Sequence, residues 1–138
     1  PIGRISELPK MIERKILSLK ELTKDYKGTC INVAINYGGR EEIIDTVNAI
    51  VNISDTNKKI DEDLFKENSY FPNTPDPELL IRTAGYSRVS NFLLWHIAYS
   101  EIDISDKLWP EFTKRDLEES IQRYKSIDRK FGGSSKNG

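Results

Sequence analysis

Residues 79–91 decide the fold and run Leu79-Leu80-Ile81-Arg82-Thr83-Ala84-Gly85-Tyr86-Ser87-Arg88-Val89-Ser90-Asn91. The first three residues are apolar and predict a brief buried strand that ends at Arg82. A glycine-containing loop follows it, and Ser90 is of a type that caps helices, so we expect a helix over residues 91–100. The segment Ile102-Asp103-Ile104 then predicts a second short strand.

Working outward from this stretch, apolar residues at helical spacing and short β-branched runs alternate along the chain. Strands and helices that alternate with short connections predict an α/β fold, a parallel sheet flanked by helices. Ligands of such folds bind at the carboxyl ends of the strands, so Arg82 and its loop should lie at the functional edge. The further elements we expect are a helix over 9–26, a strand over 30–36, a helix from 41 to about 54 with Ile43, Val47, Ile50 and Val51 along one apolar face, a short helix over 62–67 capped by Asp61, and a last helix from Thr113 to about Asp128.

Composition limits the classes of partner and site. A chain of 138 residues fits one compact domain or the larger part of one, and its net charge of −1 gives no electrostatic case for nucleic acid. The one cysteine, Cys30, begins an apolar run, and we expect it to be a buried free thiol. A single histidine and a single cysteine argue against a structural zinc site.

Two arginines flank the loop after the first strand. Arginine forks bind phosphate oxygens through paired hydrogen bonds, and a helix start with a serine hydroxyl adds further donors. Arg82, Arg88 and Ser90 therefore predict a site for a small polyanion such as a diphosphate. The alternative from spacing alone is that both arginines pair with surface carboxylates, and a generic phosphate-binding α/β domain is the fallback.

Motifs over nearly the whole chain resemble the cis-prenyltransferase family, whose bacterial members include undecaprenyl diphosphate synthase. On this resemblance, residues 1–133 are the C-terminal part of a single catalytic domain, and residues 134–138 are a flexible tail. The matching segments are Ile2-Gly3 with Leu8-Pro9, Asn32-x-Ala34-x-Asn36-Tyr37-Gly38-Gly39-Arg40, Pro75-Asp76-Pro77, Arg82-Thr83-x-Gly85-x-x-Arg88-x-Ser90-Asn91-Phe92-Leu93-Leu94-Trp95, Ala98-Tyr99-Ser100-Glu101, Leu108-Trp109-Pro110-Glu111-Phe112 and Arg129-Lys130-Phe131-Gly132-Gly133.

The resemblance implies a reaction and its partners. Members of the family condense isopentenyl diphosphate with an allylic prenyl diphosphate, with Mg²⁺, to give a cis-polyprenyl diphosphate such as the undecaprenyl lipid-carrier precursor. It also implies a homodimer in the cytoplasm, with a lipid product that could bring the enzyme to the membrane surface. The family's Asp-Gly-Asn-Gly-Arg motif has no counterpart in this sequence. We therefore expect no catalytic residue in this segment, and no activity from the segment alone.

The resemblance also assigns roles to single residues. Arg82, Arg88 and Ser90 match positions that hold the diphosphate of isopentenyl diphosphate. Glu101 matches a carboxylate that helps hold Mg²⁺ and reaches across the dimer interface.

Weaker assignments concern a motif and the tail. Asn36 and Arg40 lie in a motif at the active-site edge, without an individual catalytic role. Lys130 and Gly132 belong to a tail segment that approaches the partner's diphosphate site.

Three departures from the family pattern stand out. Tyr86 occupies a position that usually holds Glu, which leaves the pocket more positive, and we expect it to be tolerated rather than catalytic. His96 replaces a usual Gln, and a lone histidine among apolar residues favours a structural role over proton transfer. Lys130 replaces an Arg and loses its fork. Two alternatives stay open. One is a non-catalytic partner subunit of a heteromeric cis-prenyltransferase, against which the retained Arg82, Arg88, Ser90 and Glu101 argue; the other, which the Tyr86 departure would suit, is a member with short products or an unusual condensation.

Overall fold

The computed structural model describes residues 1–53, 59–72 and 74–128, which form two compact units. The first, here called the helical unit, comprises residues 1–75 and 89–95. The second, the strand unit, comprises residues 76–88 and the chain from residue 96 onward. The expected tail over residues 134–138, together with Lys130 and Gly132, lies outside the described residues.

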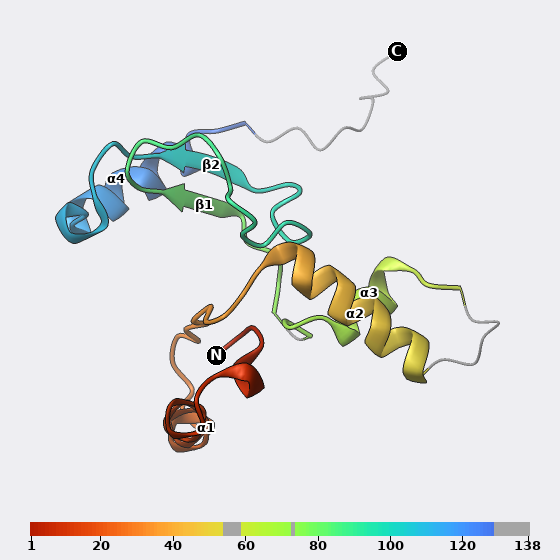
Figure 1. The fold of residues 1–138 in the computed structure, drawn as a ribbon. Helices are drawn as coiled ribbons and strands as arrows, with labels where there is room; N and C mark the ends of the chain where they lie inside the picture. The colour runs from red at the N-terminus through yellow and green to blue at the C-terminus, as the bar shows by residue number, and fades with distance from the viewer. Residues whose placement is uncertain (54–58, 73, 129–138) are drawn as a thin grey trace, which may run out of the picture. The chain divides into compact units, whose positions relative to one another are not determined.

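The strand unit contains a parallel pair of strands, β1 (Leu79–Arg82) and β2 (Glu101–Ile104). Leu79 lies opposite Glu101 and Arg82 lies opposite Ile104, so both strands end at the same edge. Helix α4 (Lys114–Lys125) packs against both strands (Figure 1). A short 3-10 helix, η2 (Trp109–Glu111), precedes it. Both predicted strands and the last helix form, although β1, which was expected to be buried, is half-buried along its whole length.

Local signals account for the strand unit. The apolar run at 79–81 forms β1, and Pro77, two residues before the strand, lacks an N–H and cannot join the ladder. Thr113 caps α4 by accepting a hydrogen bond from the Asp116 backbone N–H, while the Asp116 carboxylate accepts one from the Thr113 N–H. This reciprocal pair satisfies two donors that a helix start otherwise leaves open.

The helical unit contains η1 (Ile5–Glu7), α1 (Lys10–Thr23), α2 (Gly39–Ile53) and α3 (Glu62–Asn68). Helices α2 and α3 pack together around a small core of Ile50, Leu64 and Phe65, with Ile43 against it. Asp61 caps α3, because its carboxylate accepts a hydrogen bond from the Leu64 N–H at 3.0 Å. The three predicted helices in this part of the chain are therefore confirmed.

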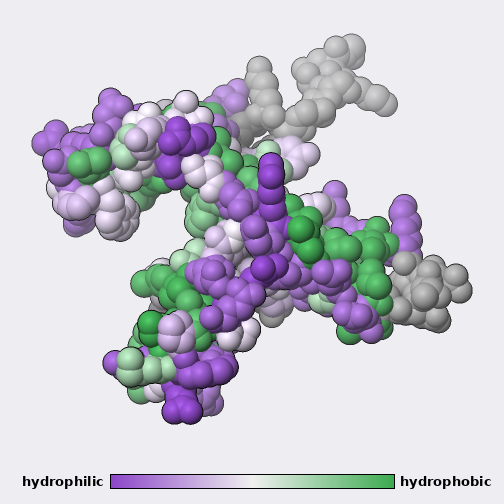
Figure 2. All heavy atoms as spheres, viewed as in Figure 1, coloured by the Kyte–Doolittle hydropathy of each residue, from purple (hydrophilic) through white to green (hydrophobic). Residues whose placement is uncertain are grey.

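Helix α1 forms as its periodicity predicts, yet it buries no residue. Its Leu19 and Leu22 are 62% and 70% exposed. Figure 2 shows hydrophobic residues at the surface around α1 and in the region of α2 and α3. Among the described residues, no helix combines the length and apolar character needed to cross a membrane.

The buried face of α2 differs from the predicted one. The sequence pattern placed Val47 and Val51 on an apolar face with Ile43 and Ile50, but Val51 is 63% exposed and Val47 lies at the surface. The buried positions are Gly39, Glu42, Thr46 and Ile50, spaced so that they share one side of the helix. A carboxylate can occupy this face because hydrogen bonds to Glu42 offset the cost of its burial.

The predicted strand over 30–36 is wrong for the described residues. Ala34 forms only an isolated parallel bridge with Ile2, supported by hydrogen bonds from the Ile2 N–H to Val33 and from the Ile35 N–H to Ile2. Cys30 is exposed rather than buried. A β-branched run forms a strand only when a neighbouring strand supplies a hydrogen-bonding ladder, and here that contact is one bridge long.

The predicted helix over 91–100 is also wrong, since the described structure has turns and bends there instead. Ser90, Asn91 and Leu93 have positive φ angles of 49°, 63° and 47°. A right-handed helix requires consecutive negative φ angles, so these residues interrupt it at its start. The helix N-terminus that the sequence placed behind the arginine loop is therefore absent from the described residues.

Candidate functional site

The loop after β1 is held firmly at its base. The Ser105 N–H donates to the Arg82 carbonyl at 2.8 Å, and the Ala84 N–H donates to the Lys107 carbonyl at 2.8 Å. The Gly85 N–H adds a bond to the Ser105 carbonyl at 2.9 Å. These bonds tie the segment after β1 to the segment after β2, so the loop leaves the sheet edge from a fixed base.

Gly85 is the residue that this turn requires. Its φ of 70° lies in the left-handed region that glycine adopts readily, and Ala84 before it is also left-handed at 66°. A Cβ at Gly85 would lie 2.9 Å from the Asp106 carboxylate. The turn therefore reverses the chain within two residues, immediately before Tyr86.

Arg82, Tyr86 and Arg88 form the centre of the candidate site. The guanidinium carbon of Arg88 lies 4.2 Å from the centre of the Tyr86 ring, and that of Arg82 lies 5.9 Å away. Arg82 is half-buried at the end of β1, while Arg88 and Tyr86 are exposed. Both predicted anion-binding arginines thus lie around one aromatic ring within the strand unit.

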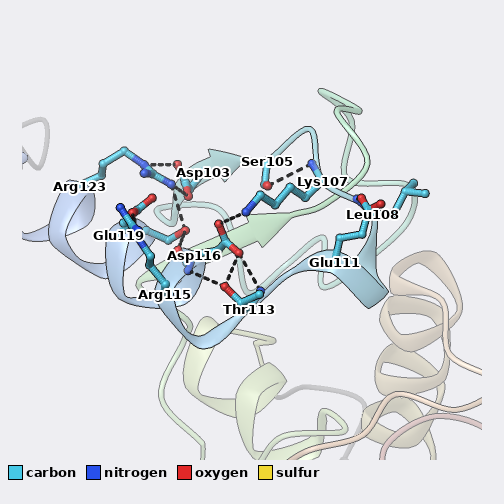
Figure 3. Close-up of polar contacts among 11 residues, drawn as sticks. Asp103, Ser105, Lys107, Leu108, Glu111, Thr113, Arg115, Asp116, Glu119 and Arg123 are labelled. Atoms are coloured by element: carbon cyan, nitrogen blue, oxygen red, sulfur yellow. Dashed lines mark hydrogen bonds and ion pairs between the residues drawn. The ribbon is translucent and has the colours of Figure 1, made fainter.

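A polar framework supports the segment that holds the loop (Figure 3). Arg123 of α4 binds the Asp103 carboxylate of β2 through two hydrogen bonds of 2.9 and 2.7 Å. Lys107, whose carbonyl accepts from the loop, donates through its Nζ to Asp116 at 2.6 Å. The Arg123 guanidinium holds the pKa of Asp103 below its usual range, and the hydrogen bond from Lys107 does the same for the pKa of Asp116. Helix α4 therefore fixes both the strand and the loop base.

Ser90, the third predicted diphosphate ligand, lies in the segment 89–95 that belongs to the helical unit. It is exposed and adopts a left-handed conformation, so it does not cap a helix as predicted. Its neighbour Asn91 instead satisfies the start of α2. The Asn91 carbonyl accepts from the Gly39 N–H at 2.6 Å, and its side-chain oxygen accepts from the Arg40 N–H at 2.9 Å.

Asn36 and Arg40, which were predicted to lie in a motif at the active-site edge, belong to the helical unit. Asn36 has a φ of 49°, and its side-chain amide donates to the Arg4 carbonyl and to the Glu7 carboxylate, both at 3.0 Å. Arg40 is exposed in the first turn of α2. An open pocket of about 690 Å³ lies beside this motif within the helical unit, lined by Arg4, Glu7, Ala34, Asn36, Tyr37, Gly38, Glu41, Asn91 and Phe92.

The sequence did not predict a partly buried polar network beside this motif. Glu42 is 1% exposed and accepts hydrogen bonds from the Tyr37 hydroxyl at 2.5 Å and from the Tyr70 N–H at 3.2 Å. The Tyr70 hydroxyl donates to Asp45 at 2.5 Å, and Arg4 binds Asp45 through two bonds of 2.9 Å. The helical spacing of Glu42 and Asp45 was the available signal, since carboxylates three apart share one side of a helix.

The network shifts several pKa values. Burial, followed by the hydrogen bond to Asp45, raises the pKa of Tyr70 to about 12. Burial, followed by the hydrogen bond to Glu42, raises the pKa of Tyr37 above its usual value. The hydrogen bonds from Arg4 lower the pKa of Asp45. These groups therefore keep their ordinary charge states at neutral pH and serve as structural contacts.

Glu101, the predicted Mg²⁺ ligand, is the first residue of β2 and is half-buried. Across residues 1–53, 59–72 and 74–128, no group of three histidine, cysteine or acidic side chains could hold a metal ion. Mg²⁺ sites in phosphate enzymes commonly use one or two carboxylates and complete the octahedron with water and substrate oxygens. Glu101 fits Mg²⁺ in that manner, as one carboxylate ligand beside a diphosphate.

His96 is 4% exposed, and its Nδ1 lies 3.0 Å from the Asp76 carboxylate. Both residues belong to the strand unit. Burial beside the Asp76 carboxylate favours the structural role predicted for this histidine.

Comparison with known proteins identifies the family. A family model described as "Putative undecaprenyl diphosphate synthase" matches residues 1–132. The chain belongs to this prenyltransferase family. An isoprenyl transferase of Thermotoga maritima is 45% identical over 134 residues, which cover 96% of this chain and 58% of the relative. A tritrans,polycis-undecaprenyl-diphosphate synthase (geranylgeranyl-diphosphate specific) of Methanopyrus kandleri is 44% identical, covering 95% of this chain and 50% of the relative.

Solved structures agree with the prenyltransferase assignment. A probable undecaprenyl diphosphate synthase from Campylobacter jejuni superposes with a TM-score of 0.85 at 34% identity, over 96% of this chain and 61% of that one. Lavandulyl diphosphate synthase from Lavandula x intermedia, in complex with dimethylallyl diphosphate, gives 0.89 at 33% identity, over 96% and 58%. The predicted α/β fold of this family is confirmed. The chain spans about half the length of the curated relatives it matches.

Proposed function

We propose that the protein elongates prenyl chains in the cis configuration, condensing isopentenyl diphosphate with an allylic prenyl diphosphate to a cis-polyprenyl diphosphate. The observation that carries this proposal is the placement of Arg82 and Arg88 around Tyr86 at the carboxyl end of β1. Membership of the prenyltransferase family supports it, since both arginines fall within the matched residues. This chain would supply the isopentenyl diphosphate site and part of a dimer interface.

The diphosphate of isopentenyl diphosphate would be held by the two guanidinium groups. Each presents several N–H donors in one plane, which match the oxygens of a phosphate. The Ser90 hydroxyl, two residues beyond Arg88 in the chain, would add one neutral donor. Fixing the diphosphate in this way orients the apolar tail of the substrate, which is the main requirement for attack by its double bond.

Mg²⁺ would be held by Glu101 together with diphosphate oxygens. When bound, the ion stabilises negative charge on a leaving diphosphate. Glu101 would contribute across a homodimer interface, and the tail residues Lys130 and Gly132 would approach the partner's diphosphate in the same way. The carboxylate that acts on the allylic diphosphate is expected in the part of the longer relatives that this chain does not match, so residues 1–138 alone should be inactive.

A second candidate is a member that makes a different prenyl diphosphate. The similarity to lavandulyl diphosphate synthase, a protein named for another product, favours keeping it. Tyr86 in place of the family's usual Glu is consistent with it. Analysis of the products by chain length and double-bond geometry separates the two candidates.

Substitution Arg88→Ala in the full-length enzyme tests the proposal. Loss of charged hydrogen bonds costs about 1.5–3 kcal/mol, so the KM for isopentenyl diphosphate should rise about ten- to hundredfold. The KM for the allylic substrate should change far less. Arg115→Ala is the matched control, because Arg115 is an exposed arginine of the same unit whose partner is Glu119 at 2.9 Å. Equal effects of Arg88→Ala on both substrates would show that the site is wrongly assigned.

A further inference from the structure

The Tyr86 ring has a specific relation to the two arginines of the proposed diphosphate site. Arg88 lies at 4.2 Å from the ring centre, well inside the roughly 6 Å range of cation–π contacts, and Arg82 lies at 5.9 Å, near its limit. Tyr86 itself is 49% exposed, so one part of its surface is covered and the rest remains open to solvent. The ring therefore contacts Arg88 closely and Arg82 more loosely.

The backbone that carries the ring is fixed two residues earlier. Ala84 and Gly85 donate hydrogen bonds to the Lys107 and Ser105 carbonyls, and both have left-handed φ angles. A tyrosine side chain has only two rotatable torsions before its ring, so a fixed backbone restricts where the ring can lie. Tyr86 can thus act as a rigid support for a long arginine side chain, which otherwise loses much conformational freedom when it binds.

Stacking and phosphate binding use different parts of a guanidinium. A guanidinium that stacks on an aromatic ring uses its planar face, whereas its N–H donors point outward in the plane. An arginine supported by a ring therefore keeps its donor edge available for phosphate oxygens. A glutamate at the same position would instead accept hydrogen bonds from that edge and compete with the substrate.

We propose that Tyr86 is a positioning residue that holds the Arg88 guanidinium over its ring, so that the N–H donors of Arg88 can bind the diphosphate of isopentenyl diphosphate. This inference rests on the proposed function and extends it. It gives the departure from the family's usual glutamate a physical role. Arg88 is positioned by an aromatic face at position 86, where the family usually has a carboxylate.

Kinetics of the full-length enzyme test this role through two substitutions. Tyr86→Phe keeps the aromatic face and should keep the wild-type KM for isopentenyl diphosphate. Tyr86→Leu removes the face, and the KM for isopentenyl diphosphate should rise about two- to fivefold, the range expected for an exposed cation–π contact. The kcat and the KM for the allylic substrate should not change in either variant. Tyr26→Leu is the matched control, since Tyr26 is 74% exposed and lies in the helical unit.

A double substitution separates this inference from the proposed function. In an Arg88→Ala background, Tyr86→Leu should have no further effect on the KM for isopentenyl diphosphate, because its partner is already gone. Three results would overturn the inference while leaving the diphosphate site in place: an unchanged KM in Tyr86→Leu, an equal loss in Tyr86→Phe, or a Tyr86→Leu effect that persists without Arg88. If Arg88→Ala alone leaves the KM unchanged, the proposed site fails and this inference fails with it.

Discussion

Asn91 offers the sharpest test of the local structure, because it caps α2 from a position 51 residues further along the chain. Its side-chain oxygen accepts from the Arg40 N–H at 2.9 Å, and its side-chain amide donates to the Glu41 carboxylate at 3.0 Å. The residue before α2 is Gly38, which has no side chain to cap the helix. The first turn of α2 therefore depends on Asn91 for a contact that helices usually make locally.

The expected magnitude has two parts. Loss of a helix cap costs about 1 kcal/mol, within a range of about 0.5–2 kcal/mol. The φ of 63° at Asn91 adds about 1 kcal/mol for alanine, which tolerates the left-handed region poorly. Asn91→Ala should therefore lower the free energy of unfolding by about 2 kcal/mol. Asn91→Gly should lower it by about 1 kcal/mol, because glycine accepts this backbone conformation but provides no cap.

Urea unfolding of the full-length protein, followed by far-ultraviolet circular dichroism, measures both values. Asn48→Ala on the exposed side of α2 is the control, and its change should stay within about 0.5 kcal/mol. In both Asn91 variants the pKa of Glu41 should rise toward its ordinary value, since the hydrogen bond from Asn91 is the main cause of its depression. A glycine variant as unstable as the alanine variant would refute the left-handed backbone, and an unaffected alanine variant would refute the cap.

Three further predictions concern titration and assembly. The pKa of Asp103 is lowered chiefly by Arg123. The stability from this pair is therefore present above the ordinary aspartate pKa of about 4 and is lost as the pH falls below it. In acid unfolding curves, the free energy of unfolding of Asp103→Asn should fall less steeply with decreasing pH than that of the wild type. The pKa of Tyr70 is raised to about 12, so the stability that it contributes is complete below about pH 10 and is lost as the pH rises toward 12. In an absorbance titration, Tyr70→Phe should lose one tyrosine transition at high pH and keep all transitions at lower pH. If Glu101 acts across a dimer, mixing Glu101→Ala chains with chains that lack the upstream catalytic aspartate should restore activity, and no rescue despite proven mixing would contradict that assignment.

Elements set by short local signals could be predicted from the sequence. The apolar run Leu79–Ile81 forms β1, Asp61 caps α3, and Thr113 caps α4. Each depends on residues within one or two turns of itself, so the pattern alone contains the necessary information. The two arginines were likewise placed by the strand end that precedes them, and the structure puts both around one ring.

Elements that depend on distant contacts could not be predicted in this way. The run after Cys30 has the composition of a strand, but only Ala34 finds a backbone partner, Ile2. Ser90 and Asn91 look like a helix start, yet the Asn91 side chain and carbonyl are used by α2 instead. The burial of Glu42 could not be predicted without knowing that Tyr37 and Tyr70 donate hydrogen bonds to its carboxylate. In each case a partner remote in sequence decides the outcome.

The absence of the predicted helix over 91–100 changes how the diphosphate site must work. A helix start would have shared the binding of the anion through its free N–H groups and partial positive charge. Within the described residues that contribution is missing, so the guanidinium groups of Arg82 and Arg88 must provide a larger share of the affinity. The effect of Arg88→Ala on the KM for isopentenyl diphosphate should then lie toward the hundredfold end of the expected range. Support of Arg88 by Tyr86 gains importance for the same reason, because the affinity then depends more strongly on a well-placed arginine.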